Sequence, residues 1–262
     1  MTSKRFASAL LLFSLCLCVP QPVAATAIGS STIGCSNLAI NPAAGSLTLG
    51  DAWTLQGFAS ANNSLGQSDA QFNSASSPGT AGATAAVTWG TASGSATALG
   101  DPPNLNVLCN ASSSANIPGN GSAAAFATGL GILSNSFTLS GTAPVNVQFA
   151  IDLTGALQVL TDALGLLAGT ETIFSLQVDG NQLLFFDLPL LIGPGQILSQ
   201  SFDTRLINSI MLDPGVSHFI SLEVDSESQA QTQPISEPGS TGLLLTGLAV
   251  CLFARRRYAL RS

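Results

Sequence analysis

The sequence predicts an all-β protein, a single antiparallel β-sandwich with jelly-roll-like connectivity, and two observations support this. From about Ser46 onward, apolar and polar residues alternate along several segments, the period of a strand with one packed face and one wet face. Clusters of glycine, proline, asparagine and serine separate these segments and favour turns. Strands of this kind bury their apolar faces by packing as two sheets around one core.

The clearest strand lies in PVNVQFAIDL, where the odd-numbered positions from Val145 to Leu153 are apolar and most even-numbered positions are polar. The segment TIFSLQVD repeats the alternation, and Asp179-Gly180-Asn181 after it favours a hairpin turn, so QLLFFDLPLL is predicted to be the returning strand. The segments SLTLGDAWTLQGF and AAVTWGTASGSATA are predicted to form further strands.

A late strand is predicted in VSHFISLEVD, after a turn at Pro214-Gly215. Alternation places four of its apolar residues on one face: Val216, Ile220, Leu222 and Val224. The strand pattern predicts that six apolar residues from three strands share one core: Phe149, Ile151, Phe174, Leu176, Leu222 and Val224.

One segment, TGALQVLTDALGLLAGT, favours a different structure. Its leucines recur at three- and four-residue spacing, with Thr154 as a candidate N-cap and Gly169 as a stop. The spacing predicts a short amphipathic helix over residues 155–168.

The N-terminal segment, residues 1–27, has the features of a secretory signal peptide. Lys4 and Arg5 precede an apolar stretch, and a proline break with small residues follows. Ala25-Thr26-Ala27 matches the small-x-small cleavage pattern, and Val23-Ala24-Ala25 is a second candidate. The general secretion machinery and a signal peptidase are therefore expected partners, and the exported domain is predicted to span residues 28–233.

The charge of that domain excludes several kinds of partner. Between residues 28 and 233, Arg205 stands alone against 13 acidic residues, a net charge of −12. Such a surface repels nucleic acid and anionic lipid, so neither is expected to bind. Solubility is the simpler explanation of the acidity, and cation binding is the alternative.

Two cysteines, Cys35 and Cys109, remain in the exported domain, because Cys16 and Cys18 leave with the signal peptide and Cys251 lies in the tail. An oxidising compartment permits a disulfide between them. Two free thiols are the alternative. Since neither cysteine has a neighbouring histidine, nucleophilic chemistry is not expected.

The sequence shows no catalytic motif, and we expect no enzyme activity and no cofactor. The single histidine, His218, shares strand parity with Val216 and Ile220, which favours a half-buried structural role over that of a general base. Trp53 and Trp89 are more typical of core or rim residues than of a sugar-stacking platform. Five acidic residues in or near predicted turns are weak calcium candidates: Asp51, Asp69, Asp101, Asp203 and Asp213.

The C-terminal tail, residues 234–262, has three parts in a fixed order. A polar motif, Ser236-Glu237-Pro238-Gly239, comes first, an apolar helix over residues 241–254 follows, and the basic cluster over residues 255–261 begins with Arg255-Arg256-Arg257. The apolar run is shorter than the roughly 20 residues that span a bilayer comfortably. It is thus a weak permanent anchor, and arginines that stay cytoplasmic make it a good temporary stop.

This three-part order closely resembles the PEP-CTERM sorting signal of exported proteins from Gram-negative, exopolysaccharide-producing bacteria. The first proline usual in that family is Ser236 here. The resemblance implies an exosortase-like membrane enzyme as a partner that processes the tail at Ser236, Glu237, Pro238 and Gly239. It implies transient insertion in the inner membrane, followed by transfer to the cell surface or the extracellular matrix.

We therefore expect an exported, non-enzymatic surface or matrix protein with a structural or adhesive role in biofilm or floc, in contact with extracellular polysaccharide. A carbohydrate- or calcium-binding lectin-like module on the same sandwich is the second hypothesis, and a hydrolase is the third.

Overall fold

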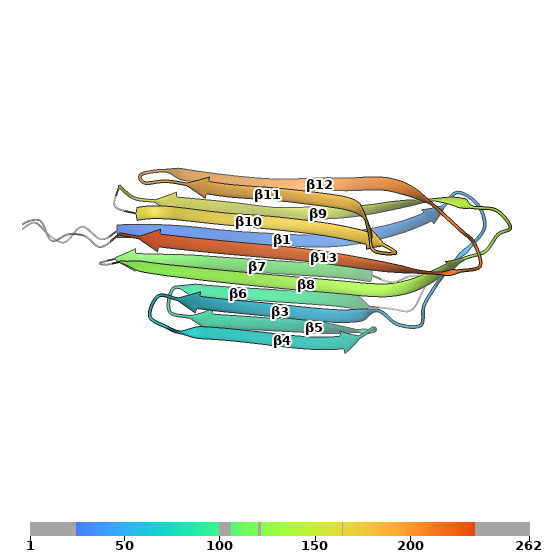
Figure 1. The fold of residues 1–262 in the computed structure, drawn as a ribbon, viewed down its shortest axis with the longest axis horizontal. Coiled ribbons are helices and arrows are strands. Elements are labelled where there is room, and N and C mark those ends of the chain that lie inside the picture. Colours follow the sequence, from blue (N-terminus) through green and yellow to red (C-terminus); the bar gives the residue numbers. More distant parts are fainter. Residues whose placement is uncertain (1–24, 100–105, 120–121, 164, 234–262) are drawn as a thin grey trace, which may run out of the picture.

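The computed structural model describes residues 25–99, 106–119, 122–163 and 165–233. Within these ranges all regular structure is β, with thirteen strands in two antiparallel sheets and no helix. The strands run along the long axis of the molecule, and the two sheets lie face to face (Figure 1). The predicted fold class, an antiparallel β-sandwich, is confirmed.

The first sheet, sheet A, has six strands. In spatial order they are β12 (Ile197–Leu212), β9 (Val145–Thr161), β1 (Ala25–Pro42), β7 (Asn106–Gly119), β6 (Gly90–Leu99) and β5 (Gly79–Val87). The N-terminal strand β1 is therefore central, with β9 on one side and β7 on the other.

The second sheet, sheet B, has seven strands. In spatial order six of them are β11 (Asn181–Ile192), β10 (Gly165–Val178), β13 (Ser217–Thr232), β8 (Ala123–Leu139), β3 (Thr54–Asn63) and β4 (Ser68–Ser76). The short strand β2 (Leu47–Leu49) also pairs with β8. The C-terminal strand β13 is central here, so both ends of the described chain lie in the middle of a sheet.

The connectivity of the second half is nested. Strand β10 pairs with β11, β9 with β12, and β8 with β13, and these pairs alternate between sheets B and A. The innermost pair is closed by the predicted hairpin turn, where Asp179 and Gly180 both have positive φ, as a two-residue primed turn requires. The turn at Pro214-Gly215 between β12 and β13 is also as predicted.

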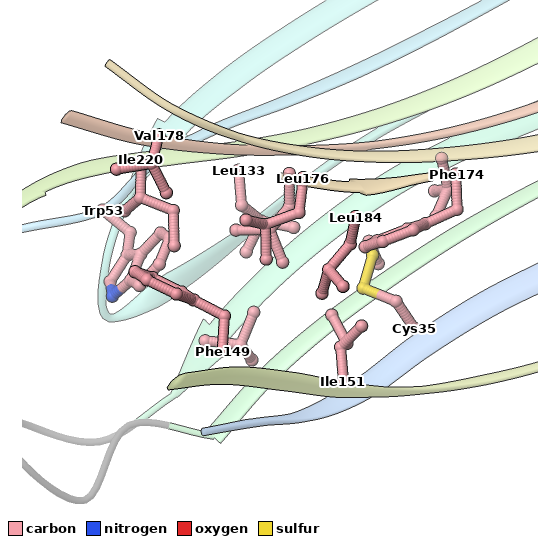
Figure 2. Close-up of a cluster of buried hydrophobic side chains, with 14 of the residues drawn as sticks. Cys35, Trp53, Leu133, Phe149, Ile151, Phe174, Leu176, Val178, Leu184 and Ile220 are labelled. Atoms are coloured by element: carbon pink, nitrogen blue, oxygen red, sulfur yellow. A yellow bond between two sulfur atoms is a disulfide. The ribbon is translucent and has the colours of Figure 1, made fainter. Parts of the chain in front are cut away.

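The main core contains all six residues predicted to share it, each of them fully buried. Figure 2 labels four of them: Phe149, Ile151, Phe174 and Leu176. Phe149 contacts Phe137 edge-to-face, with ring centroids 6.1 Å apart. The prediction for Val216 is wrong: this residue lies in the turn before β13 begins, and 49% of its surface is exposed. Parity holds only inside the paired strand, and Val216 lies one residue before it.

The predicted helix over residues 155–168 is wrong. These residues form the end of β9 and the start of β10, joined by a tight turn near Asp162. Leu157 is buried and lies between Ser31 of β1 and Gln200 of β12. Pairing on both sides of β9 satisfies its backbone and outweighs the local leucine spacing, because tertiary context overrides intrinsic propensity.

The interior changes in character along the sandwich. The inward residues of β1 are Ala25, Ala27, Gly29, Ser31, Ile33 and Cys35, which run from small to polar to bulky. At the small-residue end the sheets approach so closely that a Cβ at Gly29 would collide with the carbonyl oxygens of Gly169 and Gln229 from the opposite sheet. Small residues are required there by the close approach of the backbones.

Between the two ends, hydroxyl groups bridge the sheets. Ser31 and Ser113 of sheet A hydrogen-bond to Ser226 of sheet B, with oxygen–oxygen distances of 2.7 and 2.8 Å. Ser113 also bonds to Ser228 at 2.8 Å, and Ser228 to Thr170 at 3.0 Å. These buried hydroxyls satisfy one another, which removes much of the cost of burying polar groups.

Candidate functional surfaces

The two cysteines predicted to pair lie opposite one another in neighbouring strands. Cys35 of β1 is in register with Cys109 of β7, and the structure joins them in a disulfide with a Cα–Cα distance of 5.0 Å. Both side chains are buried in the main core (Figure 2 labels Cys35). A buried bridge of this kind has a structural role and offers no accessible thiol for chemistry.

The predicted sorting residues, Ser236, Glu237, Pro238 and Gly239, and the arginines Arg255, Arg256 and Arg257, lie outside the described residues. So do residues 1–24 of the predicted signal peptide. Strand β1 begins at Ala25, inside the range predicted for that peptide. Among the residues that the structure describes, none belongs to a helix long and apolar enough to cross a membrane.

His218 is enclosed between two turns. Its Nδ1 is 2.7 Å from Asp179 Oδ2, and its Nε2 is 2.8 Å from the carbonyl oxygen of Asp213. The ring packs on Phe137, with centroids 5.4 Å apart, and only 7% of the side chain is exposed. The second carboxylate oxygen of Asp179 accepts the N–H of Phe219 at 2.7 Å. His218 therefore ties the β10–β11 hairpin to the β12–β13 turn.

The partners of His218 fix its protonation. A carbonyl oxygen and a carboxylate only accept hydrogen bonds, so both ring nitrogens donate when the imidazole is charged. Burial opposes that charge, but the hydrogen bonds to Asp179 and Asp213 outweigh it and raise the pKa of His218. A ring with both nitrogens hydrogen-bonded in this way favours the protonated form and has no free nitrogen with which to act as a general base.

The tryptophans do not form an exposed sugar platform. Trp53 is 1% exposed and belongs to the main core (Figure 2). Trp89 is half-buried in the turn between β5 and β6, at a positive φ, and packs against the alanine-rich core cluster that contains Ala27 and Ile117. Neither indole lies flat and open on a strand face, where ring stacking with a sugar would need it.

The weak calcium candidates are not brought together. Asp69 is on β4, where it accepts the N–H of Ala86, whereas Asp203 is on the opposite edge strand β12 and Asp213 is in the turn that holds His218. Asp51 precedes β3, and Asp101 lies outside the described residues. Within the described ranges no group of three or more histidine, cysteine or acidic side chains is arranged to hold a metal ion.

A different acidic group, which sequence analysis did not single out, lies on the outer face of sheet B. We call it the acidic strip, and its members are Glu171, Asp187, Glu223, Asp225 and Glu227. Glu171 of β10 is in register with Glu227 of β13. Ile173, the next residue of β10 on the same face, is in register with both Asp187 of β11 and Asp225 of β13. The alternation of acidic residues in LEVDSES was a signal for it, since every second residue of a strand shares one face.

Repulsion and burial disturb the acidic strip. The pKa of Asp225 is raised to about 7, chiefly by burial and then by the charge of Glu227, and its Oδ1 is a buried atom without a hydrogen-bond partner. Burial and the neighbouring Asp187 also raise the pKa of Glu171. Both shifts disfavour ionisation of Asp225 and Glu171.

One part of the outer face of sheet A is uncharged. Outward-pointing residues of four adjacent strands form what we call the serine–threonine face: Ser30, Thr32, Ser112, Ser114, Gln158, Ser199 and Ser201. They line a shallow depression of about 620 Å³. The depression offers hydroxyl and amide groups, which donate and accept hydrogen bonds, and its lining contains no charged side chain and no aromatic ring.

Comparison with known proteins adds no relative. The chain matches no known family model, no curated protein and no solved structure.

Proposed function

We propose that this protein is an exported, non-catalytic component of the cell surface or extracellular polysaccharide matrix, delivered there by its C-terminal tail. The observation that carries the proposal is the order of the tail: the polar motif Ser236–Gly239, a short apolar run, and Arg255-Arg256-Arg257. The N-terminal segment, with its basic start and apolar stretch, supports export. An exosortase-like enzyme is the partner that this proposal requires.

The sandwich is compatible with such a role. Its one histidine is engaged in holding two turns, and its disulfide suits an oxidising compartment. Its outer faces carry the acidic strip on sheet B and, on sheet A, the serine–threonine face beside Asp203 and the Asp152–Arg205 ion pair. A protein with such faces stays soluble and avoids anionic lipid, which suits a component that leaves the membrane.

The experiment is intact-mass analysis of the protein extracted from the cell surface. We expect material that ends near Ser236–Gly239, and replacement of the three arginines by serine is expected to disturb sorting because the stop in the membrane is lost. Surface protein that retains Tyr258 through Ser262 would show that the tail is only an anchor.

The serine–threonine face supports a second candidate function, binding of neutral polysaccharide. Sugars present hydroxyl groups, and a depression lined by hydroxyl and amide groups can pair with them without charge. The serine–threonine face takes the place of a tryptophan platform as the candidate sugar-binding site, because Trp53 is buried.

Co-sedimentation of the exported protein with exopolysaccharide from the producing strain tests this candidate. Ser114→Arg and Ser201→Arg place bulky charges in the depression and are expected to reduce binding. Ser74→Arg, on exposed β4 of sheet B, is the matched control and should bind like the unaltered protein. Equal binding by all three variants would exclude this face.

A further inference from the structure

The start of β1 distinguishes the two candidate cleavage sites. Both cuts remove Ala25, the buried first residue of β1, but a cut after Ala27 also removes Thr26 and Ala27, whereas a cut after Ala25 keeps both. Ala27 is fully buried, lies between Ile117 of β7 and Thr161 of β9, and belongs to a core cluster with Ile117. Its loss would end the central strand of sheet A early and uncover that cluster.

The backbone of Thr26 is held by Asp162. The N–H of Thr26 donates to Asp162 Oδ2 at 2.7 Å, and the N–H of Asp162 donates to the carbonyl oxygen of Thr26 at 3.1 Å. Pro118, which lies opposite Thr26 on β7, has no N–H to donate to the carbonyl oxygen of Thr26. Asp162 thus supplies both partners to Thr26 at this position.

Asp162 is held in place by hydrogen bonds within its own turn and to a neighbouring turn. Its Oδ1 accepts the N–H of Gly165 at 2.7 Å, and its carbonyl oxygen accepts the N–H groups of Gly165 and Gly195 at 3.2 and 2.8 Å. Three segments therefore fix the residue: the β9–β10 turn, the β11–β12 turn and the start of β1. Such preorganisation favours a bond to a charged donor.

We propose that signal peptidase cuts between Ala25 and Thr26, and that the new α-ammonium of Thr26 forms an ion pair with Asp162. In this step water adds across the Ala25–Thr26 peptide bond, Ala25 leaves with a carboxylate, and the Thr26 nitrogen takes up a proton. Val23-Ala24-Ala25 supplies the small residues that the peptidase requires. The pair replaces a hydrogen bond from an uncharged amide to the carboxylate by one from a charged ammonium, at the point where the central strand begins.

N-terminal sequencing of the protein recovered after export is the direct test. This inference rests on the export proposed above, and the outcomes separate the two. A chain that begins at Thr26 supports the cut. A chain that begins at Ile28 overturns the cut but leaves export intact, and a protein that stays in the cytoplasm and still begins at Met1 overturns both.

Two variants test the site without requiring a stable fold, because the peptidase acts on the translocating chain. Val23→Phe blocks only the site after Ala25, and Ala27→Leu blocks only the site after Ala27, since each places a bulky residue where the peptidase needs a small one. We expect Ala27→Leu to be processed to a Thr26 start, and Val23→Phe to lose that start. The reverse result would overturn the proposal.

The ion pair has its own measurement. A neighbouring carboxylate favours the charged form of an amine, so the α-amine of Thr26 should react with an amine-directed reagent about ten-fold more slowly at pH 7 than in Asp162→Asn. Asp203→Asn, which alters an exposed carboxylate on β12, is the matched control and should react like the unaltered protein. Equal rates in all three proteins would overturn the pairing.

Discussion

At the scale of single residues, two hydrogen-bond acceptors favour the protonated form of the His218 imidazole. Both ring nitrogens face oxygens that only accept, so the structure favours the imidazolium and raises its pKa above the ordinary value of about 6.5. Because the folded pKa is raised, the stabilisation is fully present below about pH 6.5 and is lost as the pH rises through the folded value.

The chain has one histidine, so its imidazole signals in an NMR titration are unambiguous. We expect an apparent pKa above 6.5 for His218, and a lower one in Asp179→Asn, which removes the carboxylate charge. Asparagine tolerates the positive φ of position 179, so the turn should persist in that variant. A pKa at or below 6.5 in the unaltered protein would contradict this reading of the geometry.

Asp225 is the opposite case, a carboxyl group held above its ordinary pKa. Burial and the charge of Glu227 raise its pKa to about 7. Between the unfolded value near 3.8 and this value the folded protein binds more protons than the unfolded chain, so stability falls as the pH rises through that window. Each pKa unit corresponds to about 1.4 kcal/mol.

Asp225→Asn is therefore expected to stabilise the protein at pH 8 and to have little effect at pH 4. The measurement is the free energy of unfolding from denaturant titrations at both pH values. Asp203→Asn, on the exposed edge strand of the other sheet, is the control for the loss of one negative charge. Equal effects of Asp225→Asn at both pH values would show that ionisation of this group does not limit stability.

At the scale of elements, alternation predicted the strands that have one bulky face. It placed Phe149 and Phe174 correctly, and the hairpin chemistry of Asp179-Gly180 located the turn between β10 and β11. It failed over residues 155–168, where leucines fall at helical spacing by coincidence and the pairing of β9 with β1 and β12 decides the structure. A local pattern does not contain such partners, which at Leu157 lie 126 residues away in β1 and 43 residues away in β12.

The candidate surfaces also divide into features that the sequence predicted and features that depend on long-range strand pairing. The disulfide pair could be proposed from the compartment and the number of cysteines, since only two remained. The acidic strip draws on three strands, and the serine–threonine face draws on four, so their members become neighbours only once the register is known. Asp162 and Thr26, which are 136 residues apart, likewise become neighbours only in the folded structure.

The close approach of the two sheets at β6 can be tested with a pair of glycines from the β5–β6 hairpin. At Gly94 of β6 an added Cβ meets backbone oxygens of the opposite sheet, whereas at Gly82 of β5 the nearest atom is the Cβ of Ser95 at 3.7 Å. Gly94→Ala should lower the free energy of unfolding by about 3 kcal/mol or more, because backbone cannot move aside easily. Gly82→Ala should be neutral or slightly stabilising, and equal losses at both positions would contradict the close approach of the sheets.

At the scale of the whole molecule, the sandwich is tied together where its interior changes character. Strand β1 passes from the alanine-rich cluster at Ala27, through the hydroxyl groups around Ser31, to the main core at Ile33 and Cys35. Hydroxyl pairs specify how the sheets align in the middle, and the disulfide fixes β1 to β7 at the edge of the bulky core. The N-terminal strand therefore has both covalent and polar attachments at its central position.

The disulfide prediction belongs to this scale, because the bridge closes a loop of 74 residues that contains five complete strands from both sheets. On the chain-entropy account, a loop of this length stabilises the folded protein by about 4–5 kcal/mol relative to the unbridged chain. The double variant Cys35→Ala, Cys109→Ala should lose about that amount in a denaturant titration, with a further cost from the buried sulfur atoms removed.

Mass mapping without reductant should recover the two cysteines in one linked peptide pair, and alkylation of both thiols in native exported protein would refute the bridge. If the double variant unfolds at the same denaturant concentration as the unaltered protein, the hydroxyl bridges and the main core alone hold β1 in place.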